Sequence, residues 1–139
     1  MSGETSRSRW RAAAPGHRER GAAAVEFALV VPLRLTLVLG ITEFGLAFSS
    51  QTRISAAARE GVRALAVGGT AAGARTAARA AAPGVPLTDA QITVSPATCV
   101  GTTAGTSATV TIDHPYTFLT GFFGTGMTLS GTAVMRCEG

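Results

Sequence analysis

The sequence predicts an α+β protein in which a long N-terminal helix, able to cross a membrane, extends into a region with a small antiparallel β-sheet. Three observations support this fold class. A basic, polar stretch is followed by almost wholly apolar residues over 22–48. Helical periodicity then continues as far as Val67. Beyond Pro86 the period of the apolar residues changes from helical to alternating.

Composition narrows the class of protein further. The chain has 139 residues, of which 46% are hydrophobic and 14% are charged. This balance is too apolar for a disordered chain and too lightly charged for an ordinary soluble domain. The net charge is +4, and every basic residue is an arginine. Basic clusters interleaved with aromatic residues are typical of nucleic-acid binding, and none occurs outside the N-terminal stretch, so no nucleic-acid partner is expected.

Residues 1–21 are interpreted as a basic leader, and residues 22–48 as a transmembrane helix. The leader carries five arginines and has no hydrophobic periodicity, which is typical of a disordered segment. A helix over 22–48 extends about 40 Å at roughly 1.5 Å per residue, more than a hydrocarbon core of about 30 Å. Membrane lipid is therefore an expected partner. Arg34 near the middle of the span costs about 2.5 to 3.5 kcal/mol, which the surrounding large apolar residues offset.

Residues 49–82 are expected to form a helical segment outside the membrane. The first part contains no proline and has apolar residues along one stripe, with charged residues on the opposite face. Gly68 and Gly69 end this helix, and residues 71–82 form a second short helix that Pro83 and Gly84 stop. The apolar stripe consists of Ile54, Ala58, Gly61, Val62 and Leu65.

Residues 83–139 are expected to contain three Thr-rich strands. Apolar residues alternate there with Thr and Ser, which predicts a small antiparallel sheet with one solvent-exposed face. The amphipathic helix before the sheet is the nearest element that can pack on its apolar face. The expected inward residues are Ile92, Val94, Ala97 and Cys99, then Ala108, Val110 and Ile112, and in the last strand Met127, Leu129, Ala133, Met135 and Cys137.

Cys99 and Cys137 both fall on expected inward faces. A disulfide between them would close a loop of about 38 residues and stabilise the fold by about 2 to 4 kcal/mol. It would require an oxidising compartment, in agreement with export. The alternative is two buried thiols that never meet. No metal site is expected, because two cysteines with the distant His17 and His114 do not form a ligand cluster.

The most informative stretch is RGAAAVEF at residues 20–27, directly before the apolar run. A conventional secretory signal has its small-residue cleavage site after the apolar region, whereas this site lies before it. Gly-x-x-x-x-Glu-Phe at the cytoplasmic edge of a hydrophobic helix resembles the processing site of type IV prepilins, in the form used by the tight-adherence (Flp-type) pilus system.

Residues 20–67 as a whole resemble the TadE family of minor pseudopilins. The resemblance implies a type IV pilin-like fold and a function in assembling a Flp-type pilus. It also implies that other pilin and pseudopilin subunits and the pilus assembly platform are partners. The matching elements are RGAAAVEFALV at 20–30, Pro32, GITEFG at 40–45 and AAREGVR at 57–63.

The resemblance further implies roles for residues around the processing site. A membrane prepilin peptidase would cut between Gly21 and Ala22, with Glu26 and Phe27 completing the motif. Gly21 suits this cut because a residue without a side chain lets the backbone lie close to the catalytic carboxylates of the peptidase. Glu26 would become the fifth residue of the mature protein, where pilins pair a carboxylate with the N-terminal amine of a neighbouring subunit. The alternative is that Glu26 only lies at the headgroup boundary.

Arg34 and Glu43 are the other charged residues assigned to subunit packing. Arg34 departs from the family, which usually has Leu at this position. It lies about 12 Å of helical rise from Glu26, too far for the two to pair on one helix. Arg34 therefore pairs with another chain, snorkels to the interface, or is an idiosyncrasy of this protein. Glu43 lies near the outer end of the span, where a charge costs little, and the resemblance includes it.

No catalytic site and no cofactor are expected. The sequence has no convincing Ser-His-Asp or paired-carboxylate pattern, His17 lies in the leader, and His114 precedes Pro115 in an expected turn. The protein is interpreted as the substrate of a peptidase rather than as an enzyme.

The resemblance implies a single-pass protein of the cytoplasmic membrane, with its N-terminus inside and its C-terminal region outside, and leaves incorporation into the pilus open. Arginine distribution is a weaker guide, because Arg53, Arg59 and Arg63 follow the span while five arginines precede it. Two alternatives remain. One is an unprocessed, membrane-anchored protein with an unrelated cell-surface role. The other is a secreted protein whose apolar segment is an ordinary signal, cut after Phe48.

Overall fold

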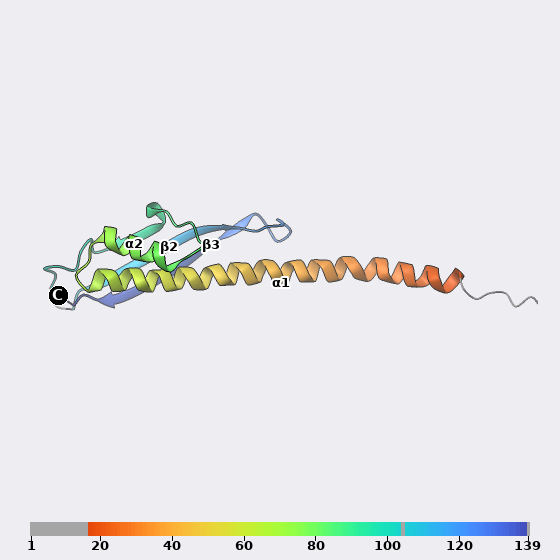
Figure 1. Cartoon of the computed structure of the whole chain (residues 1–139), viewed down its shortest axis with the longest axis horizontal. Coiled ribbons are helices and arrows are strands. Elements are labelled where there is room, and N and C mark those ends of the chain that lie inside the picture. The colour runs from red at the N-terminus through yellow and green to blue at the C-terminus, as the bar shows by residue number, and fades with distance from the viewer. Residues whose placement is uncertain (1–16, 104, 139) are drawn as a thin grey trace, which may run out of the picture. The chain divides into compact units, whose positions relative to one another are not determined.

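The computed structural model describes residues 17–103 and 105–138, with side chains from Gly21 onward. It forms two compact units, Met1–Val38 and Leu39–Gly139, and the boundary between them falls inside the first helix. The predicted α+β fold class is confirmed. The elements in chain order are α1 (His17–Ala66), α2 (Ala71–Ala81), the 3-10 turn η1 (Asp89–Gln91), β1 (Ile92–Ser95), β2 (Ser107–Thr117) and β3 (Gly126–Arg136) (Figure 1).

In the first unit, α1 is mostly apolar from Gly21 onward and almost fully exposed. Every described side chain of this unit is exposed except that of Val31, which is half-buried. A helix that is apolar all round is typical of a non-aqueous surrounding. By length and composition, α1 is long and apolar enough to cross a membrane, in agreement with the expected span.

The start of α1 corrects the expected extent of the unstructured leader. Residues 17–21 are helical, so the expectation that the leader lacks regular structure is wrong for its last five residues. The other leader residues, 1–16, lie outside the described part of the chain. Each residue added to an existing helix gains a hydrogen bond, so a helix formed by the apolar run extends backward until a breaker is met. The nearest breakers are Pro15 and Gly16.

In the second unit, the helices end where glycine and proline were expected to end them. α1 stops at Ala66, and Gly68 follows with φ of +91°, the left-handed conformation that glycine favours. Thr70 caps α2, because its hydroxyl oxygen accepts a hydrogen bond from the backbone N–H of Gly73 at 3.2 Å. α2 then ends at Ala81, two residues before Pro83.

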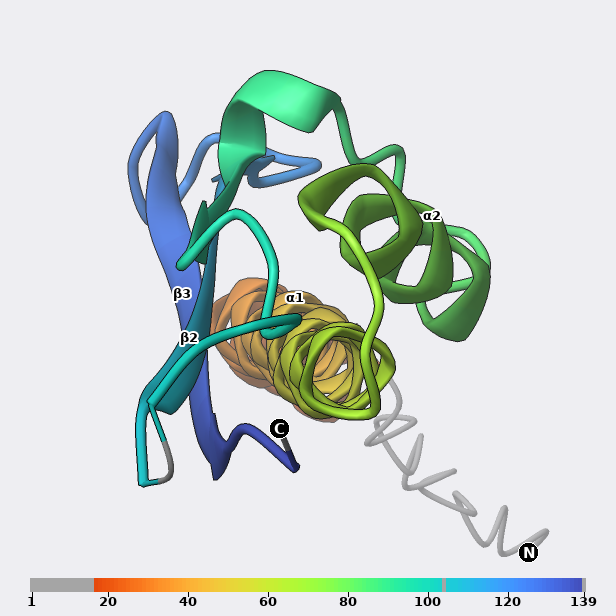
Figure 2. The same cartoon turned by 90° about the vertical axis from the view of Figure 1, so that its left-hand side faces the viewer.

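The sheet has three antiparallel strands, as predicted, and their order in the sheet is β1, β2, β3. Val94 pairs with Val110, and Val110 pairs with Ala133, so these residues share one face of the sheet. Figure 2 shows that α1 and α2 lie on the same side of the sheet. The amphipathic part of α1 therefore covers the apolar face, as the alternating pattern required.

The core lies between this face and the two helices. All five residues of the predicted stripe on α1 are buried, and Ala108, Val110 and Ile112 of β2 are fully buried. Three expected inward residues are exposed: Ala97, Met127 and Met135. Ala97 follows the end of β1 at Ser95, so strand alternation no longer applies to it. Met127 and Met135 lie near the two ends of β3, where they keep 46% and 40% of their surface exposed.

Close contact between α1 and its neighbours depends on two glycines. A Cβ atom added to Gly131 on β3 would lie 2.9 Å from Cγ2 and 3.0 Å from the carbonyl oxygen of Ile54 on α1. A Cβ atom added to Gly61 on α1 would lie 3.2 Å from the carbonyl oxygen of Ala74 and from Cβ of Ala78 on α2. Because backbone atoms limit both contacts, the neighbours cannot yield by turning a side chain.

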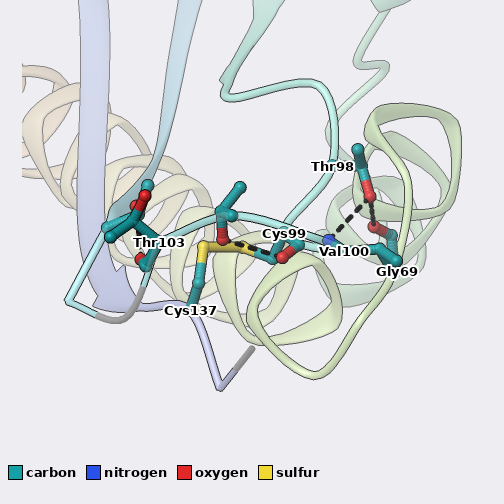
Figure 3. The surroundings of a disulfide bond; sticks show 8 residues. Gly69, Thr98, Cys99, Val100, Thr103 and Cys137 are labelled. Carbon is teal, nitrogen blue, oxygen red and sulfur yellow. Dashed lines mark hydrogen bonds between the residues drawn. A yellow bond between two sulfur atoms is a disulfide. The ribbon is translucent and has the colours of Figure 1, made fainter.

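A disulfide joins Cys99 to Cys137, whose Cα atoms are 5.4 Å apart (Figure 3). It ties the loop after β1 to the residue that follows β3, and both cysteines are buried. Next to it, the hydroxyl of Thr98 donates to the carbonyl oxygen of Gly69 at 3.3 Å and accepts from the backbone N–H of Val100 at 3.1 Å. The disulfide therefore holds this loop against the end of β3, and the bond from Thr98 to Gly69 holds it against the chain that links α1 to α2.

The contact at Gly131 predicts that Gly131→Ala lowers the free energy of unfolding by about 1 to 3 kcal/mol, because overpacking forces the backbone to shift. Gly73→Ala on α2 is the matched control, since its Cβ would meet only Oγ1 of Thr70 at 3.6 Å. The control should be neutral or stabilising by up to about 1 kcal/mol. Unfolding of the full chain in detergent micelles, followed by circular dichroism, measures both. An unchanged midpoint for Gly131→Ala would contradict the close contact.

The disulfide predicts that peptides of the unreduced protein include a linked pair containing Cys99 and Cys137. Replacing both cysteines with serine should lower the free energy of unfolding by about 2 to 4 kcal/mol, because the unfolded chain regains the entropy of the open loop. A reducing agent should destabilise the native protein by a similar amount and leave the double variant unchanged. Recovery of two alkylatable thiols from protein prepared without reductant would refute the pairing.

Candidate functional site

The expected processing site lies near the start of α1. Gly21, Ala22, Glu26 and Phe27 are all exposed, and a Cβ added to Gly21 would meet no atom within 4 Å. Gly21 is the fifth residue of α1, so it lies within the first turns of the helix. The Gly21–Ala22 peptide bond is therefore open to a protein that approaches it and close to an end where helices fray.

Glu26 and Arg34 lie on one face of α1, about two turns apart. With Ala23, Phe27 and Val30 they line a shallow hollow of about 310 Å³. Both charged side chains are exposed, and neither has an ion-pair partner within the described part of the chain. An isolated charge on an apolar helix is costly in lipid. The Glu26 and Arg34 side chains therefore need either a charged partner on another chain or a position in the headgroup region.

Glu43 is buried by its own chain, with 2% of its surface exposed. Its Oε1 accepts two hydrogen bonds from Thr120, one from the backbone N–H at 2.5 Å and one from the hydroxyl at 2.7 Å. Oε2 is also buried and has no hydrogen-bond partner among the described residues. The structure thus gives Glu43 a partner in the loop between β2 and β3, whereas the sequence had suggested a contact with another subunit.

The loop between β2 and β3, residues 118–125, packs on α1 around Glu43, and sequence reasoning missed this contact. The ring of Phe44 lies 6.0 Å from that of Phe118 and 5.6 Å from that of Phe123. Gly40 leaves room for Phe123, because a Cβ at residue 40 would lie 3.0 Å from Cζ of that ring. The signal that could have marked the loop is the uncharged, aromatic run FLTGFFGT, which does not follow the alternation of the strands around it.

The described residues hold no group of three or more His, Cys, Asp or Glu side chains that could bind a metal ion. Cys99 and Cys137 bind each other. The chemistry that this part of the chain offers is charge pairing at Glu26 and Arg34 and apolar contact along α1 and the 118–125 loop.

Comparison with family models identifies the same segment as the motifs. The model of the TadE-like protein family matches residues 21–63, about a third of the chain. No curated protein and no solved structure matches the chain. The matched segment begins at Gly21 and includes Glu26, Arg34 and Glu43. This match confirms the resemblance of residues 21–63 to the TadE-like family that was drawn from the sequence.

Proposed function

We propose that this protein is a minor pseudopilin that helps to assemble a Flp-type, tight-adherence pilus after a prepilin peptidase removes its leader behind Gly21. One observation carries the proposal. The TadE-like match begins at Gly21, the residue where the motif predicts cleavage, and follows the apolar helix α1 from there. A match to this family suggests a protein associated with the Tad pilus, and the pseudopilin role is the specific form that we propose.

In this proposal α1 anchors the protein in the cytoplasmic membrane, with the leader inside and the second unit outside. The five arginines of the leader favour this orientation. The disulfide between Cys99 and Cys137 also supports it, because disulfides persist in oxidising compartments outside the cytoplasm.

The continuity of α1 favours this proposal over an ordinary signal that is cut after Phe48. Residues 47–50 lie inside a helix, and Ala47 is 5% exposed. No break in α1 therefore separates the apolar run from the helical residues that follow Phe48. The other alternative, an anchored protein that is never processed, differs from the proposal in its N-terminal residue.

Within the assembly, we assign the subunit contacts to Glu26 and Arg34. Cleavage behind Gly21 makes Glu26 the fifth residue of the mature chain, so its carboxylate can pair with the new N-terminal amine of a neighbouring subunit. Arg34 on the same helix face then meets an acidic group of another pilin, pseudopilin or platform subunit. Both residues are exposed on α1 with no ion-pair partner in the described part of the chain, which supports this assignment.

Processing predicts that the mature protein extracted from membranes begins at Ala22. Gly21→Asp should leave the precursor uncut, because a charged side chain keeps the backbone away from the catalytic carboxylates of the peptidase. Gly16→Asp, which adds the same charge five residues earlier in the leader, should be processed normally. N-terminal sequencing decides the matter, and a mature chain that begins at Met1 or beyond Phe48 would end the pseudopilin proposal.

Charge pairing predicts that Glu26→Ala impairs pilus assembly and that Glu26→Asp, shorter by one methylene, impairs it less. Removal of one member of a desolvated pair leaves the other uncompensated, at a cost of about 3 to 5 kcal/mol. Membrane fractionation is the control, since both variants should still insert. Piliation is scored in a host that depends on this copy of the protein. Normal pili with Glu26→Ala would mean that Glu26 is only an interfacial anchor.

A further inference from the structure

One end of the second unit is rich in large apolar side chains and nearly free of charge. Between Glu43 and Arg53 on α1 there is no Asp, Glu, Lys or Arg, and the same is true between Asp113 and Arg136 in the β2–β3 hairpin. Large side chains nevertheless face outward here. Leu119 and Phe122 in the loop are 74% and 72% exposed, and Phe48 on α1 is 71% exposed. An exposed apolar surface of this kind marks a binding site or a membrane contact.

We propose that the 118–125 loop is a second membrane contact, which lies at the outer headgroup boundary and inserts Leu119 and Phe122 into the outer leaflet beside α1. This inference rests on the proposed function in one respect, namely that α1 crosses the membrane. It goes beyond that function because it gives the loop a lipid partner.

Glu43 and Thr120 hold the loop in the position that this contact needs. A carboxylate on an apolar helix requires hydrogen-bond donors when it is removed from water. Thr120 supplies two donors to Oε1 of Glu43, and the rings of Phe118 and Phe123 pack on Phe44. The loop thereby covers the one charged group in this part of α1 and is itself fixed against the helix.

The position of the loop along α1 corresponds to the outer edge of the bilayer. A hydrocarbon core needs about 20 helical residues, so a span that starts near Ala24 ends near Glu43. Irregular backbone is not tolerated within the hydrocarbon itself when it faces lipid, but aromatic residues accumulate at the interface. A loop of Phe, Leu, Gly and Thr that packs on Gly40, Glu43 and Phe44 fits the interface.

The character of the exposed side chains favours lipid over a second protein chain. Helix contacts within membranes are rich in small residues that let backbones approach. The loop exposes Gly121 and Gly124, but its largest exposed side chains are those of Leu119 and Phe122. Large exposed side chains continue on α1 at Ile41 and Phe48. Because α1 already anchors the chain, contact with the membrane costs the loop little additional freedom.

Quenching of tryptophan fluorescence by brominated lipid tests the contact. The single native tryptophan, Trp10, is replaced by Phe, and Phe122→Trp is made in the full chain and reconstituted in phosphatidylcholine vesicles. With bromine on the acyl chains, Phe122→Trp should lose most of its fluorescence, and its emission should be blue-shifted. Val100→Trp is the matched control, because Val100 is 65% exposed and adjoins the disulfide, at the other end of the β2–β3 hairpin. It should show neither effect.

Leu33→Trp, in the apolar part of α1, separates failure of the loop contact from failure of the span. Quenching at Leu33→Trp with none at Phe122→Trp would refute the loop contact and leave the proposed function intact. No quenching at either position would refute both. If Phe122→Trp is protected from water only at high protein-to-lipid ratio and is not quenched by lipid, a second copy of the chain covers the loop and the lipid assignment is wrong.

Discussion

The close contact between α1 and the sheet is the constraint on which the second unit depends. Gly131 lets β3 approach the backbone of α1 at Ile54, and Gly61 lets α2 approach from another side. These contacts bring Val110 and Ile112 of β2 into the same core as the α1 stripe. The buried apolar residues are Ala, Val, Leu, Ile and Cys, with no fully buried aromatic ring among the described residues, so the core is small. A small core gains much from a cross-link, and the disulfide supplies one.

The single helix α1 has different surroundings in the two units. In the first unit the side chains of α1 are exposed on all sides and mostly apolar, which suits lipid. In the second unit the same helix has one buried stripe and a charged outer face that begins at Arg53. The part of α1 between Leu39 and Phe48 combines both, since Glu43 and Ala47 are buried while Phe44 and Phe48 remain exposed. This part is where a membrane boundary and a protein core can meet.

The three charged residues in the apolar part of the TadE-like segment differ in what they leave for other molecules. Glu43 is covered by Thr120 of its own chain, and both of its hydrogen bonds are made within the second unit. Glu26 and Arg34 are exposed on one face of α1. In this part of the helix, Glu26 and Arg34 therefore remain as the two candidates for a charged contact with another subunit.

The sequence by itself determined the fold class, the C-terminal end of α1, the buried stripe on α1 and the inward residues of β2. These follow from local periodicity and from glycine and proline, which act within a few residues of their own position. Only the tertiary structure decided the partner of Glu43, the contact of the 118–125 loop with α1 and the need for glycine at residue 131. Each of these joins residues about 77 positions apart, and no periodic pattern records which distant segments meet. Hydrogen bonding and packing between α1 and the β2–β3 hairpin fix these contacts. A buried carboxylate is stable only with a hydrogen-bond donor, and two backbones can pack closely only where no side chain separates them.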